Sequence, residues 1–166
     1  LRYGIPEFKL EKFVVQRRIK LMEKEGIEFI CSTNVGIDIS SEELKKEFDA
    51  ICLAGGSTVP RDLPIDGRAL DGVHFAMEFL SQPNWEGESK KVPISAKNKN
   101  VVVIGGGDTG ADCLGTSIRQ GAKKITQIEI LPEPPESRTK SNPWPEWPMI
   151  LRTSSAHEEG GKREYN

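Results

Sequence analysis

The sequence is poor in cysteine, and this scarcity narrows the chemistry open to it. Its 166 residues include three cysteines, Cys31, Cys52 and Cys113, and no CxxC spacing joins any two of them. The spacing argues against a disulfide framework, a zinc site and a redox dithiol. Each cysteine lies in or beside an apolar stretch. We therefore expect all three to be small buried residues in a reducing compartment.

Long apolar runs and an excess of one charge are also missing. No apolar run approaches the length of a membrane span, and the first residues lack a signal-peptide pattern. The 23 basic and 25 acidic residues nearly balance, and the basic stretch at 90–99 has no interleaved aromatic residues. These absences predict a cytoplasmic protein without a nucleic-acid or membrane partner.

Two enzyme classes lack their signature residues here. Tyr165 is the one tyrosine after residue 3 and no lysine follows it, which argues against a short-chain dehydrogenase with a Tyr-x-x-x-Lys pair. No GK[ST] follows the glycines at 105–110, which excludes a P-loop. The chain begins with Leu1 instead of Met, within what reads as the middle of a domain, so we expect a fragment.

The first half of the chain alternates helical and strand-like patterns. We expect, in order, a helix at 11–24, a strand at 27–31, a short helix with a cap signal at Ser41, and a buried strand at 48–54. The last strand runs into Gly55 and Gly56, at the carboxyl end of a strand, where α/β sheets bind ligands. This glycine pair indicates either a close backbone approach to a ligand or an ordinary loop.

The pattern of the second half of the chain predicts a strand–helix–strand unit. We expect an irregular crossing at 57–72, a helix at 73–82, a polar linker at 83–99, a strand at 100–105, a helix at 108–120, a strand at 124–131 and a proline-rich loop with two tryptophans at 132–148. The apolar strands are typical of a parallel sheet covered on both faces. The linker predicts two domains, at 1–82 and 100–166.

A glycine-rich turn joins the first of these later strands to its helix. Gly105 would allow the tight turn, Gly107 would let the backbone reach a pyrophosphate, and Gly110 would let the helix approach the strand. Amides near Asp108 and Thr109 would donate to phosphate, and the Thr109 hydroxyl could add a donor. Because a carboxylate repels a pyrophosphate, we expect Asp108 to cap the helix or to face the nicotinamide side.

An acidic residue lies where a dinucleotide-binding unit needs one. Glu129 stands nineteen residues after Gly110, close to the spacing of about 20 residues for an acid that accepts from a ribose 2′-hydroxyl. Its charge would repel a 2′-phosphate, which favours NADH over NADPH. The alternative is an exposed carboxylate at a strand end.

Several stretches together closely resemble one family. They read RYGIPEFKL, AICLAGGSTVPRDLPIDGRALDGVHFAMEFL, VVVIGGGDTGADCLGTSIRQGAKKITQIEILPEPP and NPWPEWP. Covering nearly the whole chain, they resemble the small (beta) subunit of glutamate synthase and the related N-terminal half of dihydropyrimidine dehydrogenase. The resemblance implies an α/β, Rossmann-like flavoprotein with two dinucleotide-binding domains, of which 1–82 is part of the FAD domain and 100–166 part of the NAD(P) domain.

The resemblance also implies an activity. NAD(P)H would reduce FAD by hydride transfer from nicotinamide C4 to flavin N5, and electrons would pass through iron–sulfur clusters to a large (alpha) subunit that forms glutamate from glutamine and 2-oxoglutarate. No side chain here need act as acid or base, so we expect no catalytic residue and no metal ligand. The cluster segment and the remaining FAD segments are expected before Leu1 and after Asn166, so the isolated fragment would be inactive.

Site residues follow from the resemblance by position. Lys9 and Val35 match places that line FAD, and Arg138 roughly matches a cofactor-contacting arginine. The second FAD-side glycine segment matches Ala54, Gly55 and Gly56, and the nicotinamide-dinucleotide turn matches Gly105, Gly106, Gly107, Asp108, Thr109 and Gly110. Where NADPH-using relatives have an arginine pair, this sequence has Ile130 and Leu131 after Glu129, which again favours NADH.

Two other functions remain open. A related NADH-dependent pyrimidine, sulfide or ferredoxin reductase subunit would share this core, because nothing in the stretch distinguishes the electron-accepting partners. A non-catalytic NAD(H)-binding module would carry no flavin. The glycine pair at Gly55 and Gly56 argues against such a module, since a single-nucleotide sensor has no need of a second ligand-facing turn.

Overall fold

The computed structural model describes residues 1–82 and 93–166 and divides the chain into two compact units. Unit 1 comprises residues 1–12 and 74–166, and unit 2 comprises residues 13–73. The expected domain boundaries remain a prediction, and most of the expected linker lies outside the described residues. In the part of the chain that the structure describes, no helix is long and apolar enough to cross a membrane.

Unit 1 is built on a parallel sheet of three strands. They are β1 (Asn100–Ile104), β2 (Lys124–Glu129) and β3 (Lys162–Tyr165), in that spatial order, with Val102 opposite Thr126 and Gln127 opposite Arg163. β1 and β2 are rich in β-branched residues, which suit a pleated surface. Together with α4 (Asp108–Arg119), they form the parallel strand, helix and strand unit expected from the sequence.

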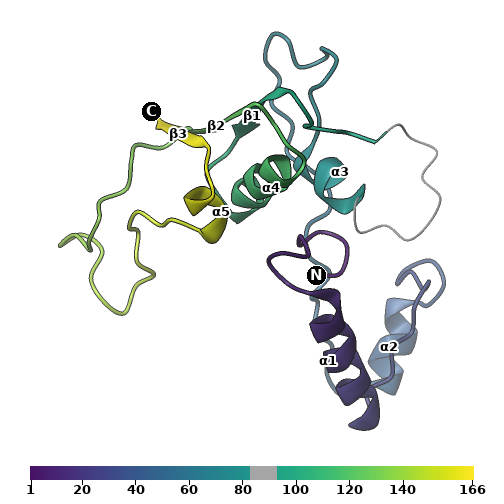
Figure 1. Cartoon of the computed structure of the whole chain (residues 1–166). Coiled ribbons are helices and arrows are strands. Elements are labelled where there is room, and N and C mark those ends of the chain that lie inside the picture. The colour runs from purple at the N-terminus through teal and green to yellow at the C-terminus, as the bar shows by residue number, and fades with distance from the viewer. Residues whose placement is uncertain (83–92) are drawn as a thin grey trace. The chain divides into compact units, whose positions relative to one another are not determined.

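Helix α4 lies at the centre of the packing in unit 1. It contacts β1, β2 and two shorter helices, α3 (Ala76–Ser81) and α5 (Ser155–Glu158) (Figure 1). Leu114 of α4 is fully buried. The core around it comprises Phe79, Leu80, Ala96, Val103, Cys113, Ile125 and Ala156. The α/β architecture expected from the sequence is therefore confirmed. Helix α4 follows the carboxyl end of β1 and packs against β1 and β2.

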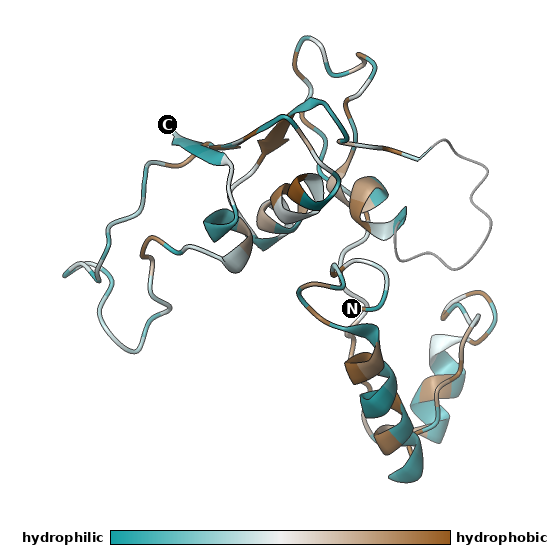
Figure 2. Cartoon of the chain, in the orientation of Figure 1, coloured by the Kyte–Doolittle hydropathy of each residue, from teal (hydrophilic) through white to brown (hydrophobic). Residues whose placement is uncertain are grey.

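The other face of the sheet differs from expectation. Val102 and Ile104 are 60% and 67% exposed, and β1 is strongly hydrophobic after its first residue, Asn100 (Figure 2). The expectation that both faces are covered is wrong for the described residues, because the crossover helix α4 covers one face and no described element packs on the opposite one.

Strand β3 and helix α5 were not expected from the sequence. β3 reads KREY and is hydrophilic (Figure 2), so it lacks the apolar run that indicates a strand. Its main chain nevertheless pairs in parallel with β2, and such pairing depends on the backbone. Between the two strands, residues 132–148 form neither helix nor strand, as their prolines predict.

Unit 2 contains two of the expected helices. Its longer helix, α1 (Lys12–Lys24), matches the pattern at 11–24, and α2 (Ser41–Glu47) matches the second. The cap of α2 is Ser40 and not Ser41: Ser40 Oγ accepts from Glu43 N at 3.2 Å, and Glu43 Oε2 accepts from Ser40 N at 2.8 Å. This reciprocal pair is a capping box, and it shifts the cap by one residue.

The strands expected at 27–31 and 48–54 are absent. Both segments are irregular, with Ile30 69% and Leu53 94% exposed. A strand needs a neighbour to satisfy its backbone groups, and the only pairing in unit 2 is an isolated bridge between Val35 and Ile39. The cysteines of these segments, at 31 and 52, are exposed, contrary to expectation, whereas Cys113 is buried as expected.

Candidate dinucleotide site

The glycine turn connects the carboxyl end of β1 to the start of α4. Gly105 has φ +117°, in the left-handed region that favours glycine, and its amide donates to Ile128 O at 2.8 Å. Gly107 is the N-cap of α4, in an extended conformation. The chain thus reverses tightly after β1, which is the role the sequence predicts for Gly105.

The other glycines of the turn divide into two kinds. A Cβ at Gly110 would collide with Gly105 O and would lie 2.6 Å from Gln127 Nε2, and one at Gly106 would collide with the Glu129 carboxylate. A Cβ at Gly107 would meet no atom within 4 Å. Gly110 is therefore required by the packing of the turn itself, and a side chain at Gly106 would displace the Glu129 carboxylate. Gly107 leaves space for a ligand to approach the backbone.

The start of α4 presents amide donors that no described residue engages. Among the described residues, no hydrogen bond is formed by the amides of Gly107, Asp108, Thr109 and Gly110, and the first helical bond runs from Ala111 N to Gly107 O at 3.0 Å. Such amides and the positive end of the helix dipole suit an anion.

Asp108 does not cap the helix as expected. It is the first residue of α4, after Gly107, and no side-chain hydrogen bond caps this end. The reason is positional: a capping side chain comes from the N-cap residue, which here is a glycine. The other expectation, that Asp108 faces the nicotinamide side, remains a prediction, and Asp108 and Thr109 are both exposed.

Glu129 lies against the glycine turn. Its Oε2 accepts from Gly106 N at 2.7 Å, while Oε1 accepts from Ile130 N at 2.7 Å and Leu131 N at 3.2 Å. The spacing argument thus located a carboxylate that meets the turn. Its contact with a ribose remains a prediction.

Sequence reasoning missed two residues beside the turn. Gln127 of β2 is 1% exposed; its Nε2 donates to Gly105 O at 2.7 Å, and its Oε1 lies 2.7 Å from His157 Nε2. The one signal for Gln127 was a polar residue within an apolar strand. For His157 no signal existed, because α5 has no marked periodicity and its contact with β2 crosses 30 residues.

Arg138 is held within its own loop. Its Nη1 donates to Asn142 O at 3.2 Å. The loop is organised by buried Asn142, whose Nδ2 donates to Trp147 O at 3.0 Å and whose Oδ1 accepts from Met149 N at 2.8 Å. Arg138 is exposed, and its contact with a cofactor remains a prediction.

The residues expected to line FAD fall in both units. Lys9 belongs to unit 1, where its Nζ lies 3.4 Å from Asp112 Oδ1 of α4. Val35 and the segment 54–56 belong to unit 2 and are exposed. Gly56 has φ +70°, so its backbone uses the conformational freedom of glycine. The FAD assignments remain predictions.

Cys113 is the cysteine of α4, the helix that follows the glycine turn. All three cysteines are free, and burial, with the nearby Asp112 carboxylate as a lesser cause, raises the pKa of Cys113 to about 12. A thiol with so high a pKa is a poor nucleophile at neutral pH.

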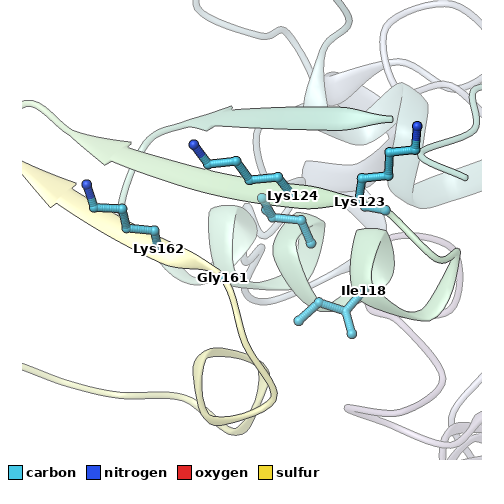
Figure 3. Close-up of a pocket in the computed structure, with 7 residues that line it drawn as sticks. Ile118, Lys123, Lys124, Gly161 and Lys162 are labelled. Carbon is cyan, nitrogen blue, oxygen red and sulfur yellow. The ribbon is translucent and has the colours of Figure 1, made fainter. Parts of the chain in front are cut away.

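A hollow lies at the opposite end of the sheet. Figure 3 shows it at the amino ends of β2 and β3, beneath Lys123, Lys124 and Lys162 and beside Ile118 of α4. Lys162 Nζ pairs with Glu164 Oε1 at 2.8 Å. Because the glycine turn follows the carboxyl end of β1, this hollow is separate from the candidate site and contains none of the expected site residues.

Comparison with known proteins identifies a family that matches most of the chain. The family model described as pyridine nucleotide-disulphide oxidoreductase matches residues 10–142, and the chain belongs to this oxidoreductase family. Membership implies binding of FAD and NAD(P)H. Because none of the cysteines of this chain is paired, the disulphide part of the family description has no counterpart among them.

Individual relatives narrow the class further. The chain is 56% identical to the glutamate synthase [NADPH] small chain of Mycobacterium tuberculosis, over 100% of this chain and 36% of the relative. It is 48% identical to the corresponding small chain of Bacillus subtilis, over 96% and 33%, and 54% identical to glutamate synthase [NADH] of Schizosaccharomyces pombe, over 96% and 8%. The chain thus spans about a third of the length of the bacterial small chains.

Proposed function

We propose that the chain forms the nicotinamide-dinucleotide site, and part of the FAD site, of a glutamate synthase small subunit. The observation that carries the proposal is the open backbone at Gly107 beside four amides that no described residue engages. A helix start of this kind fits a pyrophosphate. Support comes from the family match and from the names of the relatives.

Each part of the turn has a task in nucleotide binding. The amides from Gly107 to Gly110 and the Thr109 hydroxyl hold the pyrophosphate, and Glu129 accepts from the ribose 2′-hydroxyl. The same carboxylate disfavours a 2′-phosphate, so the proposal favours NADH. The relatives carry both NADPH and NADH in their names, and titration with the two nucleotides tests the preference of this chain.

The protein contributes position and not proton transfer. When bound, NAD(P)H and FAD supply the hydride-transfer chemistry. Contacts to these cofactors are assigned to Lys9, Val35, Ala54, Gly55, Gly56 and Arg138. No described side chain is needed as an acid or base, so we assign no catalytic residue.

The same proposal includes the groups that accept electrons from the flavin. Iron–sulfur clusters outside these residues would receive them, and a large subunit would use them to form glutamate from glutamine and 2-oxoglutarate in the cytoplasm. The family match would equally suit an NADH-dependent pyrimidine, sulfide or ferredoxin reductase subunit, and the glutamate synthase names of the relatives favour the first assignment.

Replacing Gly107 by valine tests the phosphate-binding role. We expect Gly107→Val to weaken NADH binding by about 100-fold, because its side chain fills the space for the pyrophosphate. The fold should stay largely intact, with a loss of only about 1 kcal/mol, because a Cβ there meets no protein atom and valine is merely a poorer N-cap than glycine. Isothermal titration calorimetry and thermal unfolding of the full chain measure the two effects.

Gly110→Ala is the matched control within the same turn. Its Cβ would collide with Gly105 O, so stability should fall together with binding. Unchanged NADH affinity in Gly107→Val would overturn the phosphate-binding role.

An anaerobic titration of the holoenzyme tests flavin and cofactor preference. Bleaching of the flavin absorbance by NADH at lower concentration than by NADPH is expected, and Glu129→Gln should narrow the difference. Absence of flavin from the holoenzyme would contradict the hydride-transfer proposal and favour a binding module.

A further inference from the structure

One peptide unit of the glycine turn is held at both ends by side chains of β2. In the peptide joining Gly105 and Gly106, the carbonyl accepts from Gln127 Nε2 and the amide donates to Glu129 Oε2, each at 2.7 Å. Residues two apart on a strand point to the same face, so Gln127 and Glu129 reach the turn together. The orientation of this peptide sets the direction of the amides that follow it.

Gln127 is an unusual residue for its place. It is 1% exposed in a strand whose other buried member is Ile125, and a buried amide costs stability unless both of its ends are bonded. Both ends are bonded here, to the turn and to His157. A β-branched residue would fill a strand position without this requirement, so the two hydrogen bonds are what the amide provides at this position.

Donor and acceptor can be assigned for each hydrogen bond in the series that links Gly105, Gln127 and His157. Because Gly105 O is an acceptor only, the Gln127 atom beside it is Nε2, and Oε1 therefore accepts from His157 Nε2. Nδ1 of His157 is then the acceptor for Ser154 N at 3.2 Å, which requires a neutral ring. Burial, with Arg163 of β3 and Lys9 as lesser causes, lowers the pKa of His157 from its usual value, in agreement with that ring state.

The last glycine of the turn, Gly110, makes room for this series of hydrogen bonds. A Cβ at Gly110 would lie 2.6 Å from Gln127 Nε2 and would collide with the carbonyl that Gln127 bonds. Gly110 therefore allows the helix to pack not only against the strand but also around a side chain.

We propose that Gln127, oriented by His157, is a positioning residue of the nucleotide site, which holds the Gly105–Gly106 peptide so that the amides of Gly107, Asp108 and Thr109 converge on a pyrophosphate. This assignment rests on the proposed function. The assignment extends the proposed function by giving α5, which lies outside the glycine turn, a part in nucleotide affinity.

The test compares isosteric variants in NADH binding and turnover. Gln127→Met keeps the side-chain length and removes both bonds; we expect an increase of about tenfold in the Kd of the full chain and in the KM of the holoenzyme for NADH, with kcat within about twofold. His157→Phe keeps a ring and removes the donor to Gln127, and should raise both constants about threefold. It changes a half-buried residue and therefore carries the test if Gln127→Met fails to fold.

Ser117→Ala is the matched control. Ser117 is 1% exposed and its Oγ bonds Cys113 O at 2.7 Å, away from the turn, so this variant should lose stability without a change in KM. Unchanged Kd and KM in folded Gln127→Met or His157→Phe would overturn the positioning role alone. Failure of the wild-type chain and holoenzyme to bind NADH would instead overturn the proposed function, and this assignment with it.

Discussion

Unit 1 and unit 2 contain similar sequence patterns, but they differ in how far their apolar segments pair and become buried. In unit 1, apolar strands pair with each other and are covered by α4, and Leu114 is fully buried. In unit 2, no residue from 13 to 73 is buried, although the segments 27–31 and 48–54 are as apolar as β1. An apolar run thus becomes a strand only where the chain supplies a neighbour and a covering helix.

The largest effect expected from this comparison is at Leu114. Leu114→Ala removes a side chain with 0% exposure and should lower the free energy of unfolding of unit 1 by about 2–5 kcal/mol. Leu53→Ala, at a residue 94% exposed in unit 2, should change it by less than about 0.5 kcal/mol. Urea denaturation of both variants measures the difference, and equal effects would show that unit 2 has a core of its own.

Acidification should weaken unit 1 by a smaller amount through His157. Its pKa is lowered in the folded state, chiefly by burial and then by Arg163 and Lys9, so the unfolded chain binds a proton at this residue more readily than the folded one. Stability is therefore full above about pH 6.5 and declines as the pH falls through that value.

Thermal unfolding between about pH 7.5 and about pH 5.5 measures the effect. His157→Phe should lose this part of the pH dependence. The carboxyl of Glu159, whose pKa is lowered by its hydrogen bond with Arg119, acts in a more acidic range. A profile that His157→Phe leaves unaltered would contradict the assignment of this effect to His157.

Of these substitutions, one at the N-cap of α2 is expected to affect the main unfolding transition least. Ser40→Ala removes the capping box and should destabilise the helix by about 1 kcal/mol, while the unfolding temperature of unit 1 stays unchanged. Hydrogen exchange of the α2 amides detects the local change. Ser41→Ala is the matched control, and a larger effect there than at Ser40 would contradict the capping geometry.

The candidate site was predictable where one segment contains the whole signal. Gly105, Gly107 and Gly110 lie within six residues of each other, and Glu129 follows at a spacing set by one helix and one strand. Gln127 and His157 were not predictable, because their contact joins β2 to a short helix 30 residues later. The failure at 27–31 and 48–54 has the same origin, since pairing partners are distant in sequence.

By itself, the sequence determined the elements that local backbone preferences specify: helices α1, α2 and α4, the strands β1 and β2, and the turn that needs glycine at 105. The tertiary structure alone decided that hydrophilic β3 joins the sheet and that Gln127 and Glu129 clamp one peptide of the turn. The physical reason is that helix periodicity and turn conformation are properties of neighbouring residues, whereas sheet pairing and buried hydrogen bonds form between groups that only folding brings together.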